Sequence, residues 1–218
     1  MPKAVLTEKY VFSADHIFYP ELATYAVTQI ALSTAYTCAK GESFPRLIMN
    51  KGVVTHSVLL NPQILVAMMD PGVRSSGLPI EYSAASFDRE PGNAQGPAYF
   101  VPPEIWNTVA QVCLGSAYER ISGRVKDRYR ADPWSWPPEL QYFRHIRNGC
   151  FHNNRFNLRP TYKHKTAIDS ANPPRWRTSV LTDDESVAGK RVLGSYLYSG
   201  DVPILLADMA QVFKSSPP

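Results

Sequence analysis

Apolar residues recur at spacings of three and four in several stretches of the chain, and this periodicity predicts helices. The first predicted helix covers residues 20–40, because a proline stands in its first turn and Gly41 suits a stop. A second covers residues 103–130, a third begins at Pro138, and a last one is capped by Asp201. The link between the second and third helices is short, so we expect these two to pack as an antiparallel pair.

Each predicted helix carries an apolar face that should be buried. In the first helix this face consists of Leu22, Tyr25, Ala26, Ile30 and Ser33. In the second helix it consists of Ile105, Val109, Val112, Leu114, Tyr118, Ile121 and Val125. In the last helix it consists of Leu205, Leu206, Met209, Val212 and Phe213. Such faces predict a bundle of helices around a shared core.

The helical pattern loosens over residues 43–101, which we expect to form a loop-rich insertion. Residues 61–69 can form a short helix that begins with an Asn-Pro pair. Residues 71–97 are rich in glycine, proline, serine and alanine and are too long for an ordinary connection. We therefore expect residues 71–97 to be a functional loop or a mobile one.

Two strand-like runs near the C-terminus, residues 175–182 and 190–198, flank an acidic turn. They predict a β-hairpin appendage over residues 174–199. The whole chain, residues 1–218, is then predicted to be a single, mainly α domain. Its fold would be an antiparallel helical bundle with a long Gly/Pro-rich insertion and a small C-terminal β-hairpin.

Composition is that of an ordinary globular protein, with 44% hydrophobic and 19% charged residues. No run approaches the roughly 20 apolar residues of a membrane span, and residues 1–10 lack a signal-peptide pattern. We therefore expect a cytoplasmic protein with no membrane partner. Three dispersed cysteines, Cys38, Cys113 and Cys150, are expected to be small buried hydrophobes, and not a disulfide framework or a metal cluster.

Basic residues are concentrated in one part of the chain. Residues 144–177 contain eight lysines and arginines against a single acid, Asp169. Such clustering favours a polyanionic partner, and phosphates are the common ones. The alternative is a solvated basic face that binds nothing in particular.

The helix that begins at Pro138 has two different sides at about 100° per residue. Its core side is predicted to contain Leu140, Phe143, Ile146 and Cys150. Its opposite side contains Gln141, His145, Asn148 and His152. This polar strip either faces water or meets the same helix of a second subunit, which would bring two copies of His152 together. Arg147 lies about 140° from His152 on an ideal helix and would have to reach round to it.

The stretch Arg147-Asn148-Gly149-Cys150-Phe151-His152 resembles the motif of HEPN-domain proteins, in which an arginine and a polar residue precede a histidine. The preceding Tyr142-Phe143-Arg144-His145-Ile146 and the long antiparallel helix before it are similar to the same family, so the resemblance covers residues 103–155. It implies a helical bundle that commonly forms a homodimer. It also implies a metal-independent ribonuclease of toxin-antitoxin or antiphage type, with no cofactor and with an antitoxin or regulatory protein as a further partner.

The activity that this resemblance implies is cleavage of RNA by attack of the ribose 2′-hydroxyl on the neighbouring phosphate. His152 is the expected acid/base, because imidazole gains and loses a proton near neutral pH, and its partner would be His152 of a second subunit. Arg147 would stabilise the negative charge that develops on the phosphate, and Asn148 would orient the imidazole or bind the ribose. The expected supporting or RNA-binding residues are Arg144, His145 and Arg155.

Two other functions fit the same residues. The first is a non-catalytic HEPN-like module that binds RNA, a nucleotide or a protein through its basic surface. The second is a structural or regulatory helical protein whose basic face binds nothing specific. RNA cleavage favours the enzyme, RNA binding without cleavage favours the module, and weak binding that salt abolishes favours the last.

Overall fold

Four long helices form the body of the protein, where the apolar periodicity predicts them. The computed structural model describes residues 4–39, 48–50, 57–60, 79–87, 103–129, 132–158, 168, 171–182 and 184–215. The long helices are α1 (Tyr19–Ala39), α3 (Pro103–Tyr129), α4 (Pro138–Phe151) and α6 (Asp201–Ser215), and a single turn, α5 (Asp184–Val187), precedes α6. The predicted starts at Pro138 and Asp201 are confirmed, and the other predicted ends agree to within a residue.

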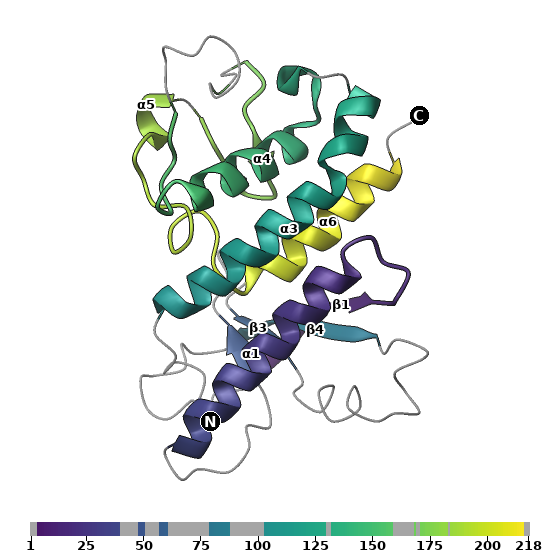
Figure 1. The fold of residues 1–218 in the computed structure, drawn as a ribbon, viewed down its shortest axis with the longest axis vertical. Coiled ribbons are helices and arrows are strands. Elements are labelled where there is room, and N and C mark those ends of the chain that lie inside the picture. The colour runs from purple at the N-terminus through teal and green to yellow at the C-terminus, as the bar shows by residue number, and fades with distance from the viewer. Residues whose placement is uncertain are drawn as a thin grey trace.

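Helix α3 lies between α1 on one side and α4 on the other, and α6 packs beside it (Figure 1). The predicted antiparallel packing of α3 and α4 is confirmed, because contacts run in opposite order along the two helices. Gly115 of α3 lies against Phe151 at the end of α4, whereas Tyr118, further along α3, stacks edge-on against Phe143, which lies earlier on α4. Among the helices that the structure describes, none is long and apolar enough to cross a membrane.

The predicted apolar face of α1 is buried, including Leu22 and Ile30. The prediction for α3 is partly wrong, because Ile105 is 41% exposed and Val112 is 63% exposed. The side of α3 that is buried carries Ala110, Leu114, Ala117, Ile121 and Val125. A second apolar strip on α3 therefore lies outside the core.

A four-stranded antiparallel sheet packs against α1 and was not predicted. Its strands are β1 (Ala4–Phe12), β2 (Ile48–Asn50), β3 (Ser57–Leu60) and β4 (Ile80–Phe87), in the order β1-β4-β3-β2. Tyr10 pairs with Tyr82 and Phe12 with Ile80, and all four side chains are buried. The expectation that residues 43–101 are loop-rich is wrong for β2, β3 and β4, while the predicted helix at 61–69 and most of the 71–97 segment lie outside the described residues.

The small C-terminal sheet is confirmed, but its predicted pairing is wrong. Strands β5 (Arg175–Trp176) and β6 (Ser179–Val180) pair with each other and are joined by a tight turn, and α5 stands where the acidic turn was predicted. Residues 190–198 form turns and isolated β-bridges instead. Their backbone bonds go to the segment after α4, because Val192 N–H donates to Asn154 O at 3.0 Å and Phe156 N–H donates to Lys190 O at 3.0 Å.

Arg177, in the turn between β5 and β6, ties three distant parts of the chain together. Its guanidinium donates to both oxygens of Asp208 on α6, at 2.7 and 3.2 Å, and to the Tyr10 hydroxyl of β1 at 2.8 Å. It also pairs with Glu8 at 3.3 Å, and the Trp176 indole donates to the same Asp208 at 2.7 Å. Hydrogen bonds to charged partners are the strong ones, so this cluster fixes the small sheet against α6 and β1.

Candidate functional site

The candidate site lies where α4 ends. His152 is the residue after the helix, with φ −106° and ψ 60°, and its N–H donates to Gly149 O at 3.1 Å. Asn153 and Asn154 both have φ 56°, a left-handed conformation that asparagine tolerates better than most residues. The two asparagines reverse the chain, so that residues 155–158 run back past the end of the helix.

Residues 189–193, which precede α6, hold this turn in place through hydrogen bonds. The buried side chain of Asn154 donates to Leu193 O at 3.0 Å and accepts from Leu193 N–H at 2.7 Å. Arg155 forms a backbone bridge with Arg191, and its guanidinium donates to Gly189 O at 2.7 Å. A side chain at Gly149 would overlap with the buried Val192. His152 is therefore presented by a rigid corner of the fold.

The polar strip on α4 converges on one small cavity. His145, Asn148 and His152 line it from the helix, and Asn157 lines it from the returning chain. Its volume is about 30 Å³, enough for a single water molecule. The Asn157 amide nitrogen lies 3.5 Å from His152 Nδ1, at the limit of a hydrogen bond, while the His152 side chain as a whole is exposed.

His145 does not face solvent, contrary to the simplest interpretation of a polar strip. Only 3% of its surface is exposed, and Gln141, one turn earlier, is buried as well and donates to Trp136 O at 2.8 Å. Burial and the nearby positive charge of Arg144 lower the pKa of His145 to about 3, because both disfavour the imidazolium. With this pKa, His145 is neutral at physiological pH, and it lines the cavity from beneath the surface.

Arg144 is also buried, with 8% of its surface exposed. Burial lowers the pKa of its guanidinium from the ordinary value, and it lies near Tyr118. Of the expected supporting residues, therefore, Arg155 alone is exposed, and its guanidinium is held by the carbonyl of Gly189.

Arg147 points toward α3 and does not line the cavity beside His152, in keeping with its predicted separation of about 140° from that histidine. It forms an ion pair with Glu119, and its guanidinium carbon lies 5.3 Å from the Tyr118 ring and 5.1 Å from the Phe151 ring. Its Nη1 nonetheless reaches back and donates to Asn148 Oδ1 at 3.2 Å. Asn148 thus lies between the arginine and the cavity that His152 lines.

Several residues of this site were not predicted. Asn157 and Asn154 come from the segment after the helix, where an Asn-Asn pair is itself a signal for a left-handed turn. Glu119 sits on the other helix, and only the packing of α3 against α4 brings it to Arg147. Of the predicted basic cluster, Arg144 is buried and Arg177 is paired with acids, whereas Arg159, Lys163, His164 and Lys165 lie outside the described residues.

No family model, curated protein or solved structure matches the chain. In the part of the chain that the structure describes, no three His, Cys, Asp or Glu side chains are arranged to hold a metal ion. The predicted burial of Cys113 and Cys150 is confirmed, whereas Cys38 is exposed.

Proposed function

We propose that this protein is a metal-independent endoribonuclease that acts as a homodimer, with His152 as its acid/base. The observation that carries the proposal is the position of His152: an exposed imidazole on a rigid helix end, beside Asn157 and in one cavity with Asn148. A group that transfers protons must be accessible to the substrate and held in place, and His152 meets both needs.

The reaction would be attack of the ribose 2′-oxygen on the adjacent phosphorus. A bond from the 2′-oxygen to phosphorus forms, the bond from phosphorus to the 5′-oxygen breaks, one base takes the 2′ proton, and one acid protonates the leaving oxygen. The products carry a 2′,3′-cyclic phosphate and a 5′-hydroxyl. His145 cannot be the second imidazole, because it is buried and has a pKa of about 3. His152 of a second copy of the chain would supply it.

Arg147 would stabilise the phosphorane. Its pair with Glu119 is accessible, since the arginine side chain is 29% exposed and the glutamate side chain 60% exposed. Ion pairs of this kind contribute at most about 1 kcal/mol, so a phosphate can replace the carboxylate as the partner of the guanidinium. Asn148 already accepts a hydrogen bond from Arg147 and would guide that guanidinium toward the substrate.

The direct test is incubation of the purified protein with single-stranded RNA in EDTA. We expect cleavage with 2′,3′-cyclic phosphate ends, and a loss of at least a hundredfold in rate for His152→Ala, in the range general acid–base catalysis contributes. His16→Ala is the matched control, since it removes an imidazole near the start of α1 and should leave the rate unchanged.

The test also requires the solution mass of wild type and of His152→Ala. We expect both proteins to be dimers, so that a loss of activity in the variant is not due to a loss of assembly. Activity that persists in His152→Ala, or that disappears with chelator, contradicts the proposal. RNA binding without cleavage, across many substrates, would favour a non-catalytic RNA-, nucleotide- or protein-binding module instead.

A further inference from the structure

A much larger cavity lies between α1 and α3, and it shares no lining residue with the one beside His152. Its volume is about 450 Å³, within the range of cavities that hold small molecules. Tyr25 of α1 and Val109, Val112 and Cys113 of α3 line it. Val112 is 63% exposed, and the cavity is the site at which this apolar side chain of α3 can contact a bound molecule.

Three threonines on the cavity wall add to its apolar character. The hydroxyl of Thr24 donates to Pro20 O at 2.9 Å, that of Thr28 to Thr24 O at 2.7 Å, and that of Thr108 to Glu104 O at 2.9 Å. Each hydroxyl bonds to a carbonyl of its own helix, so its donor is already used. What these side chains still offer to a bound molecule is mainly their methyl groups.

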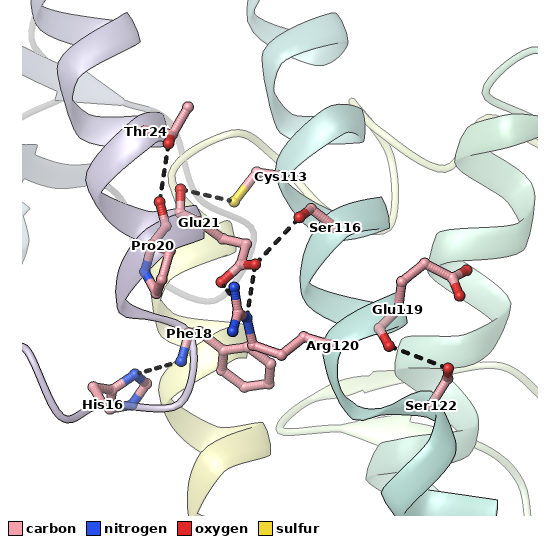
Figure 2. A network of polar contacts seen from close by, with 10 residues as sticks. All are labelled: His16, Phe18, Pro20, Glu21, Thr24, Cys113, Ser116, Glu119, Arg120 and Ser122. Atoms are coloured by element: carbon pink, nitrogen blue, oxygen red, sulfur yellow. Dashed lines mark hydrogen bonds and ion pairs between the residues drawn. The ribbon is translucent and has the colours of Figure 1, made fainter.

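One end of the cavity is polar and built around Glu21. Its side chain is 4% exposed, and its two oxygens lie 2.8 and 3.0 Å from Arg120 Nε. Ser116 donates to the same carboxylate at 3.2 Å, and Figure 2 shows both α3 side chains pointing at Glu21. A buried carboxylate must be paired, and this one is.

Arg120 has hydrogen-bonding capacity left over. A guanidinium carries five N–H groups, and the described residues accept only from its Nε–H. The Arg120 side chain is 41% exposed and lines the cavity. The polar end of the cavity therefore has N–H donors to spare, beside an ion pair in which Glu21 already balances the charge of Arg120.

We propose that the α1–α3 cavity binds a small amphipathic carboxylate, with its apolar body against Val109 and Val112 and its head group on Arg120. The apolar walls favour a hydrocarbon body, since transfer of apolar surface from water drives such binding. The unused N–H groups of Arg120 favour an acceptor, and a carboxylate makes the strongest hydrogen bonds with a guanidinium. The polar end selects against a cationic head group for the same reason.

Calorimetric titration of the full chain with octanoate tests this, with octylammonium and octan-1-ol as ligands of equal chain length. We expect saturable binding of one octanoate per chain, and binding of the other two at least tenfold weaker. No octanoate binding at millimolar concentration overturns the proposal. Equal binding of octylammonium overturns the assignment of the head group to Arg120.

Substitutions then locate the site. Val112→Asp puts a negative charge in the cavity wall and should weaken octanoate binding at least tenfold, whereas Ile105→Asp changes an exposed residue of the same helix that does not line the cavity and should bind like wild type. The double variant Glu21→Gln with Arg120→Gln replaces the ion pair by neutral amides without leaving a buried charge unpaired, and it too should weaken binding tenfold. Equal weakening in Ile105→Asp, or wild-type affinity in the double variant, contradicts the location.

Discussion

His145 and His152 stand on the same side of one helix in the sequence pattern, yet the fold gives them opposite surroundings. His145 is covered by the chain that returns after α4, while His152 is exposed at the helix end. Helical spacing predicts that the two share a side of the helix, and in the structure both line the same small cavity. Spacing could not predict which one is accessible, because Phe156 and Leu158, which line the same cavity, follow a turn of two left-handed asparagines.

The buried imidazole of His145 should make folding stability depend on pH. Its pKa falls from the ordinary 6.5 to about 3 in the folded protein, so between these values the unfolded chain binds a proton that the folded chain does not. Stability therefore rises with pH across this window and is lost as the pH falls, by up to about 1.4 kcal/mol per pH unit.

Urea unfolding at pH 7 and pH 5 measures this effect. From pH 7 to pH 5 wild type should lose about 2 kcal/mol more than His145→Gln, whose side chain does not titrate. Other titrating groups are common to both proteins and cancel in the comparison. Equal losses in the two proteins would mean that His145 is protonated in the folded state.

For Arg147, the sequence predicted the side of the helix on which the residue lies but not the residues that it contacts. The angle of about 140° from His152 correctly placed it on another side of the helix. Its partners Glu119 and Tyr118 lie on α3, some 28 residues earlier, and the sequence around Arg147 does not indicate them. Polar contacts between two helices depend on how the helices are aligned along their axes, and the apolar periodicity of each helix does not determine this alignment.

At the scale of elements, the helices could be predicted and most of the strands could not. Proline at each start and an apolar repeat of three and four identify α1, α3, α4 and α6. Strand β4 alternates correctly, with Ile80, Tyr82 and Ala84 buried, but its serines and alanines have low strand propensity and resemble a loop. Strand β1 contains a register shift between Leu6 and Glu8, and such a bulge breaks the period of two.

Two glycines at helix contacts give an element-scale prediction. Gly115 of α3 lies under the ring of Phe151, which is 58% exposed, and Gly149 of α4 lies against Val192, which is fully buried. Replacing either with alanine gains about 1 kcal/mol of helix propensity. At Gly149 the new methyl group overlaps with a side chain that has no room to move, and such overpacking costs about 1–3 kcal/mol.

We therefore expect Gly149→Ala to be destabilised and Gly115→Ala to be neutral or slightly stabilised, as measured by urea midpoints. The exposed ring of Phe151 can turn aside, so Gly115→Ala serves as the matched control for the gain in propensity. Equal shifts in the two variants would mean that Val192 can also make room.

At the scale of the whole molecule, the predicted mainly α character holds, but the four-stranded sheet and the contacts of both sheets with the helices were not predicted. The second strand of the small sheet was misplaced because residues 190–192 bond to the chain around Asn154 and Phe156, a partnership that only the three-dimensional fold defines. The same is true of Arg177, whose partners are 31 and 169 residues away.

Removing the Arg177 side chain should loosen this long-range connection. Its pair with Asp208 is largely shielded, with the two side chains 26% and 28% exposed, and Arg177→Ala should cost about 1–3 kcal/mol, the usual loss for a hydrogen bond to a charged group. Lys9→Ala breaks an exposed pair with Glu81 on the same sheet and should cost less than about 1 kcal/mol. Chemical denaturation of both variants compares the two losses of unfolding free energy. A larger loss in Lys9→Ala would contradict a stabilising role for the Arg177–Asp208 pair.

The irregularity in β1 also affects how the protein behaves among its own copies. In the sheet that the structure describes, β1 is a terminal strand, bonded to β4 on one side. Unpaired strand borders can recruit other chains and start aggregation, and proteins discourage this with bulges and charges. The register shift after Leu6 and the exposed charges of Glu8 and Lys9 provide both. The irregularity that obscures this strand in the sequence is thus also one that discourages pairing between the β1 edges of two copies of the chain.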